Sequence, residues 1–273
     1  MKKTIIAIFN ILVSLILSFF FLFPLIWLVS SAFKKREDIF NYPPEIIPAN
    51  PTYRNFIDIF QQAPFFQYML NSLFVAISIT ILALFFHSIA AYALARLKFP
   101  GRDVIFVALI ATMMIPFSVR MVPLFIITKR LGWIDTFAGL IIPSIFSAFG
   151  IFFLRQFYLT IPVELEEAAI IDGCSRFGVW YHIFLPLSKS IMIILGVLFF
   201  IANYNDFIWP LIITNSDNMR VIQVGLVYFT SARGSHWNLI LAGAAIAALP
   251  TILIFIFMQQ YLVEGIKMSG IKG

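Results

Sequence analysis

Long apolar runs, separated by short polar segments, limit what this chain can fold into. The first run extends from about Thr4 to Phe33 and contains no charged residue. A helix of about 20 apolar residues crosses the roughly 30 Å hydrocarbon core of a bilayer, and six runs reach or approach that length. The predicted spans cover residues 4–33, 68–95, 104–128, 136–154, 190–214 and 237–263. We therefore expect an all-α membrane protein with a single transmembrane domain over residues 1–273.

The overall composition agrees with this interpretation. Hydrophobic residues make up 61% of the 273 residues, charged residues make up 12%, and the mean hydropathy is +0.96. Such a chain has too little polar surface to cover a soluble globule of its size. The first span resembles a signal peptide, but no small-residue cleavage site follows a short core, so we interpret it as a retained helix.

The polar segment at residues 161–186 lies between two spans and predicts a helix, a turn and a second helix. Pro162 suits the first helical position, and three glutamates follow it where a helix N-terminus favours negative charge. Gly173 can take the left-handed conformation that closes a helix. The first helix should therefore run from Pro162 to Asp172.

Each predicted helix of this segment has a distinctive face. On the first helix, four residues at i, i+3, i+4 and i+7 form a narrow face of small side chains, which another surface can approach closely. These residues are Leu165, Ala168, Ala169 and Asp172. The second should begin with a cap at Ser175 and stop at Leu185-Pro186. Its aromatic residues should share one side, namely Phe177, Trp180, Tyr181 and Phe184. An alternative is an interfacial loop with its aromatic side chains on the lipid headgroups.

The chain lacks the motifs of an enzyme or a metal site. It contains no G-x-x-x-x-G-K-[ST] phosphate loop, no H-E-x-x-H pair and no G-x-S-x-G. Its three histidines lie on different segments, and Cys174 is its only cysteine, which rules out a disulfide within the chain. The net charge of +6 is spread over many loops, so nothing favours nucleic-acid binding. We expect no catalytic residue, no metal ligand and no cofactor in this chain.

Two spans carry polar side chains, which are costly in lipid and usually face a cavity or a partner. At about 1.5 Å per residue from the inner ends, Arg120 of the third span and Asp206 of the fifth both lie near the outer surface. Pro210 should loosen the fifth helix. These residues could line a solute path or gate. Alternatively, Arg120 snorkels to the headgroups while Asp206 caps or pairs within the bundle. The candidate path residues are Arg120, Asn203, Asn205, Asp206 and Trp209.

The polar segment also carries a spacing found in a known family. Glu167-Ala168-Ala169 is followed by three residues and Gly173, and then by nine residues and Ile183-x-Leu185-Pro186. This pattern resembles the cytoplasmic coupling loop of permease subunits in ATP-binding-cassette importers. Further stretches are similar to the maltose-type permeases of carbohydrate importers, namely Met113-Met114-Ile115-Pro116, Leu131-Gly132-Trp133-Ile134-Asp135-Thr136 and Asn205-Asp206-Phe207-Ile208-Trp209-Pro210-Leu211.

The resemblance covers nearly the whole chain and implies a six-transmembrane-helix type I importer permease with a cytoplasmic coupling helix. It implies four further partners: a second permease, two copies of a cytoplasmic ATPase that bind ATP and magnesium, and an extracytoplasmic solute-binding protein. The expected function is uptake of a sugar or oligosaccharide. The alternative is the same architecture importing a polyol or glycerol phosphate. A transporter or channel that works alone would need coupling or gating residues within this chain.

By resemblance, the coupling loop docks in a cleft of the ATPase and moves as a rigid lever. The residues assigned to coupling are Glu166, Glu167, Ala168, Ala169, Asp172, Gly173, Phe177 and Pro186. The loop at 215–237 reaches toward the binding protein in relatives of this type, and its candidate contacts are Asn218, Gln223, Gly225 and Ser231. The proline-rich segment 34–67 is expected to be another external loop.

The orientation follows from the resemblance more than from the charges. With both termini inside, ten Lys and Arg residues lie on the inner side and eight on the outer side, which is weak support from the positive-inside rule. The cluster Lys34-Lys35-Arg36 argues the other way. A coupling loop that meets a cytoplasmic ATPase places both termini in the cytoplasm, in the inner membrane of a bacterial or archaeal cell.

Overall fold

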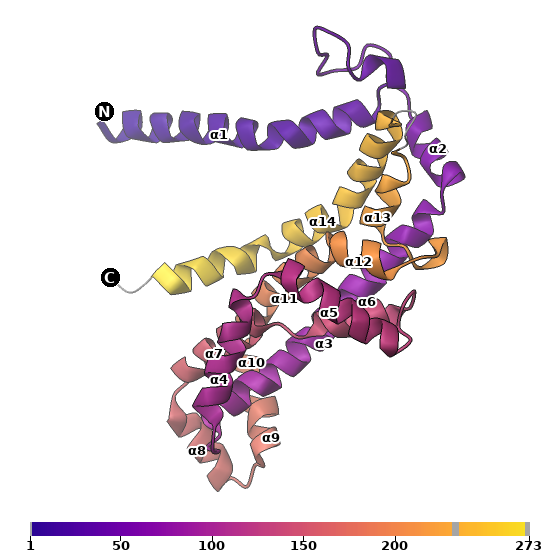
Figure 1. The fold of residues 1–273 in the computed structure, drawn as a ribbon. Coiled ribbons are helices and arrows are strands. Elements are labelled where there is room, and N and C mark those ends of the chain that lie inside the picture. Colours follow the sequence, from indigo (N-terminus) through magenta and orange to yellow (C-terminus); the bar gives the residue numbers. More distant parts are fainter. Residues whose placement is uncertain (1, 231–234, 271–273) are drawn as a thin grey trace. The chain divides into compact units, whose positions relative to one another are not determined.

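The computed structural model describes residues 2–230 and 235–270 and consists, within these ranges, of helices joined by connections without strands (Figure 1). The chain divides into two compact units. The first combines the residues up to Phe66 with Ile222–Leu249, and the second combines Gln67–Val221 with the residues from Pro250 onward. Two long helices, α3 at Phe65–Arg96 and α14 at Trp237–Gly270, continue from one unit into the other.

The first unit contains the first part of α14 and the long helix α1 at Lys2–Ala32. It also contains three short elements, η1 at Arg36–Asp38, α2 at Arg54–Gln62 and α13 at Ile222–Val227. One buried amide connects three of its helices. Nδ2 of Asn55 in α2 donates to the carbonyls of Ala32 and Lys34, each at 2.8 Å. Nδ2 of Asn238 in α14 donates to Oδ1 of Asn55 at 2.8 Å. The end of α1 and the start of α14 are therefore both held by α2.

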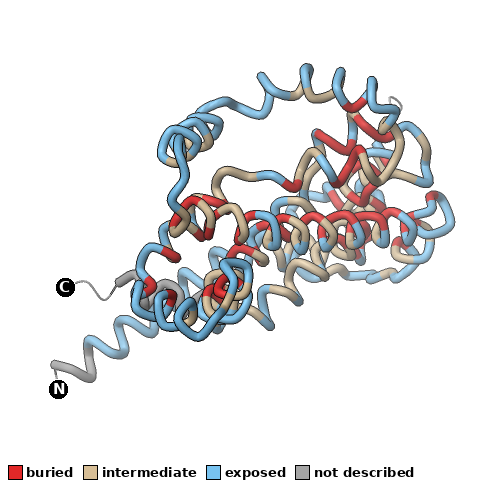
Figure 2. The backbone as a smooth tube through the Cα atoms, turned by 90° about the horizontal axis from the view of Figure 1, so that it is seen from below, coloured by how far each residue is buried: buried red, intermediate tan, exposed pale blue. Residues whose placement is uncertain are grey.

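The helix α1 leaves its apolar surface uncovered. Residues 6–24 are all exposed, and this part of the helix that follows the N-terminus is pale blue in Figure 2. A continuous apolar surface of this kind must be covered by lipid or by another protein. This exposure agrees with a membrane-spanning helix.

The core of the second unit forms around α3, α7 at Ala148–Thr160 and α11 at Lys189–Tyr204. Gly150 of α7 lets the three helices approach, because a Cβ there would lie 2.4 Å from Nδ1 of His87 and 2.6 Å from the ring of Phe199. His87 is fully buried, and its Nε2 accepts a hydrogen bond from the backbone N–H of Ser147 at 2.9 Å. This histidine therefore belongs to the packing of the bundle.

Three of the predicted spans are continuous helices long and apolar enough to cross a membrane, namely α1, α3 and α14. The predicted span at 104–128 is instead bent by 105°. It consists of α4 at Arg102–Ala111, η2 at Thr112–Met114 and α5 at Phe117–Arg130. Ile115 is extended at the bend, because the ring of Pro116 disfavours the helical conformation of the residue before it.

The predicted spans at 136–154 and 190–214 are also broken. α6 at Phe137–Ile145 meets α7 at 41°. α11 ends at Tyr204, and α12 at Ile208–Ile213 follows after a short break. The prediction that Pro210 loosens this helix is confirmed, because the break covers residues 205–207, the turn in which a proline at 210 removes the hydrogen bond to the carbonyl of residue 206 and crowds that carbonyl. Pro210 itself sits in the first turn of α12.

Candidate functional site

The polar segment between α7 and α11 folds as a helix, a tight turn and a second helix at one end of the second unit (Figure 1). The first helix is α8 at Val163–Ile171, one residue shorter at each end than predicted. Pro162 precedes the helix in an extended conformation, with φ −55° and ψ 138°. The proline thus lies at the N-cap position, and Asp172 lies at the C-cap.

Gly173 closes α8 as predicted. Its φ is +84°, and its N–H donates to the carbonyl of Ile170 at 3.0 Å. The next N–H, of Cys174, donates to the carbonyl of Ala169 at 2.9 Å, so the turn satisfies carbonyls that would be free at the helix end. Oγ of Ser175 then accepts from the N–H of Gly178 at 3.1 Å, which caps the second helix as expected.

The second helix differs from the prediction. It comprises α9 at Arg176–Val179, the π-helical segment η3 at Trp180–Phe184 and α10 at Leu185–Leu187. It ends at Leu187, one residue after the predicted stop at Leu185-Pro186, and α11 then leaves at an angle of 77°. The aromatic residues do not share one side either. Trp180 and Phe184 are buried, whereas Phe177 and Tyr181 are exposed.

Most of the residues assigned to coupling lie on the surface of this loop. The exposed ones are Glu167, Ala168, Asp172, Gly173, Phe177 and Pro186, and Ala169 is half-buried. Large apolar side chains accompany them, with Val163, Leu165 and Ile171 all exposed and Ile171 at 85%. A helix that presents apolar side chains outside the span region is suited to insertion into a partner protein.

Glu166 was predicted to share this surface, but the structure places it inside the unit. Its side chain is the only buried one on α8 and has a relative exposure of 5% as a residue. Oε1 accepts a hydrogen bond from Nη1 of Arg176 at 2.7 Å, and Oε2 lies 3.8 Å from Nε of Arg96 at the end of α3. A buried carboxylate needs such cationic partners, which the sequence pattern of α8 alone does not reveal.

The candidate path residues are held in different ways. Trp209 is buried at 2% exposure, and its Nε1 donates to the carbonyl of Gly139 at 3.0 Å, so it packs α12 against α6. Nδ2 of Asn203 donates to the carbonyl of Phe199 at 2.8 Å within α11. Asp206 is half-buried at the start of α12 and lies beside the backbone N–H groups of that turn. The geometry thus agrees with the capping alternative for Asp206.

Arg120 and Asn205 are both exposed. Arg120 lies on α5, and the bend between α4 and α5 means that counting residues from Val104 does not give its depth. Nδ2 of Asn205 donates to the carbonyl of Ile201 at 2.8 Å. Within residues 2–230 and 235–270, no ion pair joins Arg120 to Asp206. The five candidates therefore do not form one charged cluster.

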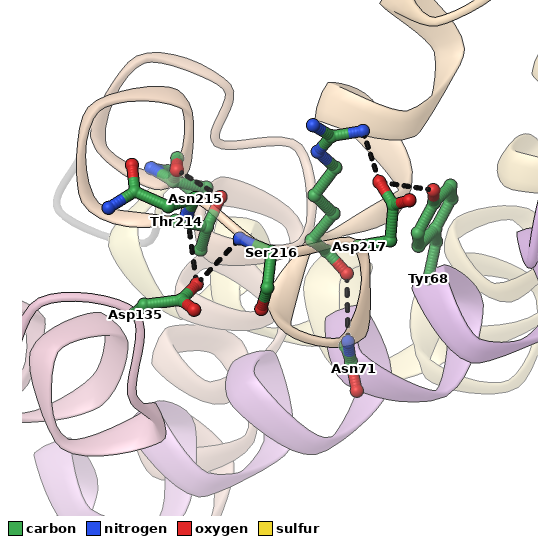
Figure 3. Close-up of polar contacts among 9 residues, drawn as sticks. Tyr68, Asn71, Asp135, Thr214, Asn215, Ser216 and Asp217 are labelled. Atoms are coloured by element: carbon green, nitrogen blue, oxygen red, sulfur yellow. Dashed lines mark hydrogen bonds and ion pairs between the residues drawn. The ribbon is translucent and has the colours of Figure 1, made fainter.

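Sequence reasoning missed a polar network that fixes the segment after α12, which includes η4 at Asp217–Met219 (Figure 3). Oδ1 of Asp135 accepts from the N–H groups of Asn215 at 2.8 Å and Ser216 at 3.0 Å. The hydrogen bonds from Ser216 and Asn215 hold the pKa of the Asp135 carboxyl below its ordinary value. Asp135 itself has φ 57° and lies in the turn between α5 and α6.

The opposite side of the same segment is anchored to α3. Nδ2 of Asn71 donates to the carbonyls of Asn218 at 2.8 Å and Arg220 at 2.9 Å. The hydroxyl of Tyr68 donates to Oδ1 of Asp217, which also pairs with Arg220 (Figure 3). Asn71 is a buried amide in an otherwise apolar span, and this was the sequence signal that could have indicated a bound partner.

The candidate contacts of the loop at 215–237 are distributed over both units. Asn218 is exposed, and its backbone carbonyl is the acceptor for Asn71. Gln223 is half-buried and Gly225 is buried in α13. Ser231 lies outside the residues that the structure describes.

The fold and the exposed loop together define a class of protein, a multi-pass helical membrane protein with an exposed apolar helix outside its spans. Residues 87–268 match the family described as binding-protein-dependent transport system inner membrane component. The chain belongs to this family.

Relatives are similar over nearly their whole length. The arabinooligosaccharides transport system permease protein AraQ of Bacillus subtilis is 35% identical over 95% of this chain and 93% of its own. The sn-glycerol-3-phosphate transport system permease protein UgpE of Pectobacterium atrosepticum is 32% identical over 90% of each. The fold matches a chain of a crystal structure described as a bacterial ABC transporter involved in the import of alginate, with a TM-score of 0.83, 21% identity and coverage of 95% and 97%.

Members of this family are permease subunits of importers driven by ATP-binding-cassette ATPases. Membership therefore implies, in general terms, a partner permease, a partner ATPase and a solute-binding protein. It also confirms the predicted type I permease fold and the assignment to an inner membrane.

Proposed function

We propose that this chain and a second permease together form the transmembrane path for a sugar or oligosaccharide, and that the loop at 161–186 docks in a cleft of a cytoplasmic ATPase. The observation that supports this most is the exposure of α8, which presents Val163, Leu165 and Ile171 beyond the span region. An apolar face that stays exposed in the isolated chain requires a partner.

The construction of the loop suits the transfer of motion. A closed turn at Gly173 and a capped helix after Ser175 give a stiff unit, and a stiff unit moves as a whole when the ATPase dimer closes. That movement would switch the permease between inward-facing and outward-facing states. Because the ATPase is cytoplasmic, the loop and both chain termini lie on the cytoplasmic side.

The proposed solute is an oligosaccharide. Two relatives that match 94% and 95% of this chain are named as arabinooligosaccharide permeases, which supports this class of solute. The alternative is glycerol phosphate, as named for the relative at 32% identity. Among the candidate path residues that the structure describes, only Arg120 favours an anionic solute, because its guanidinium is exposed and makes no ion pair with a described residue. A thermal-shift panel on the cognate binding protein separates the two, because arabinotriose or glycerol 3-phosphate should raise its melting temperature selectively.

Ala168→Glu tests the docking proposal. The residue is exposed, so the change leaves the fold intact and places a charge on the face that enters the ATPase. We expect ATP-driven uptake by the complete importer to fall at least tenfold and less ATPase to co-purify with the permeases. Glu164→Gln, on the same exposed helix, is the matched control and should change neither quantity. Wild-type uptake and ATPase content in the Ala168→Glu complex would contradict the proposal.

A further inference from the structure

The coupling helix α8 makes an unusual contact with the rest of its unit. All of its apolar side chains except the half-buried Ala169 are exposed, and the only side chain that it buries fully is that of Glu166. A cavity of about 660 Å³ lies beside this contact and is lined by the end of α3, the following loop and α8. Apolar packing of α8 against the core is limited to the half-buried Ala169, so charged groups make a large part of the connection between α8 and α3.

Arg96 is the point on α3 where these groups meet. Its guanidinium donates to the carbonyl of Ile161, just before α8. It lies 3.8 Å from the carboxylate of Glu166, within α8, and 5.2 Å from the centre of the Phe184 ring, in η3. One arginine at the end of a core helix thus contacts the coupling loop before, within and after α8.

Arg176 completes the arrangement from the other side. It is the first residue of α9 and donates to Oε1 of Glu166 at 2.7 Å, although 59% of its side chain is exposed. The two oxygens of Glu166 are thereby shared between the end of α3 and the start of α9. Among the residues that the structure describes, none is a hydrogen-bond partner of the Nε of Arg96, and the ion pair with Glu166 is long at 3.8 Å.

We propose that Glu166, Arg96 and Arg176 form a clamp that transmits movement of the coupling helix to the core helix α3. Glu166 is a positioning residue in this role, not a contact to the ATPase. This inference rests on the proposed function, because the movement that it transmits is the one produced by the ATPase. Without the clamp, α8 would remain connected to the bundle through its covalent links and the packing of Ala169 against the core.

The physical basis is the cost of separating these groups. A buried carboxylate that loses its cations is left without solvation, so α8 and α3 move together more readily than they separate. An apolar contact of the same area would allow sliding, because it has no preferred direction. The clamp therefore gives a defined direction to the movement.

Hydrogen–deuterium exchange on the complete importer tests the clamp. The probe is magnesium with a non-hydrolysable ATP analogue, which needs no knowledge of the solute. In the wild-type complex, we expect nucleotide to change exchange at least threefold both in α8 and in the last turn of α3. In Glu166→Gln, the response of α8 should persist, while the response of α3 should fall below about half of the wild-type change.

Two further variants make the test decisive. Glu164→Gln, on the exposed side of α8, should leave both responses as in the wild type. Arg176→Gln removes only the exposed partner, and it should also at least halve the α3 response even if Glu166→Gln assembles poorly. A full α3 response in both clamp variants would overturn the clamp. A wild-type complex whose α8 does not respond to nucleotide would instead overturn the proposed function, and the clamp with it.

Discussion

At the scale of single residues, Asp135 shows how one side chain can fix a whole segment. Its φ of 57° lies in the left-handed region, which Asp tolerates better than most residues because its short polar side chain bonds locally. From that position its carboxylate accepts two backbone N–H groups after α12, and its own N–H donates to the carbonyl of Ile213 at 2.8 Å. The turn after α5 and the end of α12 are thus joined at one residue.

Asp135→Ala should therefore destabilise the protein. The change removes the acceptor of two hydrogen bonds and places an alanine in the left-handed region, and we expect a cost of about 1–2 kcal/mol. Asp135→Asn keeps an acceptor and tolerates the conformation, so its cost should be smaller. Thermal unfolding of the detergent-purified protein at neutral pH measures both. Equal melting temperatures for the alanine variant and the wild type would contradict this role.

The same residue predicts a pH dependence. The folded-state pKa of Asp135 is lowered by its hydrogen bonds, so its contribution is complete above the unfolded pKa of about 4 and is lost as pH falls through the folded value. The difference in melting temperature between wild type and Asp135→Asn should therefore shrink below about pH 4. A difference that stays constant down to pH 2 would show that the charge of Asp135 makes no contribution.

At the scale of helices, the apolar runs predicted where helices lie but not where they bend. Pro116 was visible in the sequence, yet a count of apolar residues treats 104–128 as one straight span, whereas the structure bends it by 105°. The turn at Gly173 was predictable because its requirement is local, a positive φ. The burial of Glu166 was not, because it depends on Arg96, which lies 70 positions earlier in the sequence.

The close approach of α3, α7 and α11 gives a prediction at this scale. Gly150→Ala puts a Cβ 2.4 Å from His87 and 2.6 Å from Phe199, so the helices must separate, and we expect a loss of about 1–3 kcal/mol. Gly196→Ala in α11 is the matched control, because its nearest neighbour is Leu84 at 3.3 Å. The control should be near neutral, since alanine also favours the helix. Thermal unfolding that ranks the two variants equally would contradict the packing described.

At the scale of the whole molecule, the chain is an importer permease subunit, and its proposed orientation in the membrane depends on the proposed contact between the loop at 161–186 and a cytoplasmic ATPase. Cys174 is the only cysteine in the chain and lies in the turn after α8, so it reports the side of that loop directly. Lys34, which argued against cytoplasmic termini, is buried, bonds the carbonyl of Glu45 and lies over the ring of Trp27. It is therefore not a free surface charge.

A membrane-impermeant maleimide should label Cys174 in inverted membrane vesicles and not in intact spheroplasts. The matched control moves the cysteine to the predicted external segment 34–67, as Tyr42→Cys in a Cys174→Ser background, because Tyr42 is 96% exposed. That variant should label only from the outside. Labelling of Cys174 in intact spheroplasts would reverse the proposed orientation.

The central claim is that a partner ATPase drives this permease through the loop closed by Gly173. Arabinotriose and glycerol 3-phosphate uptake, each supplied with the cognate binding protein, can be measured in proteoliposomes that contain the complete importer with Gly173→Asn or Gly173→Pro. Asparagine tolerates the φ of +84°, whereas proline fixes φ near −65° and removes the N–H that bonds Ile170. We predict near-normal ATP-dependent uptake for Gly173→Asn and at least a tenfold loss for Gly173→Pro. Uptake at the wild-type rate by Gly173→Pro, or uptake without the ATPase, would contradict the claim.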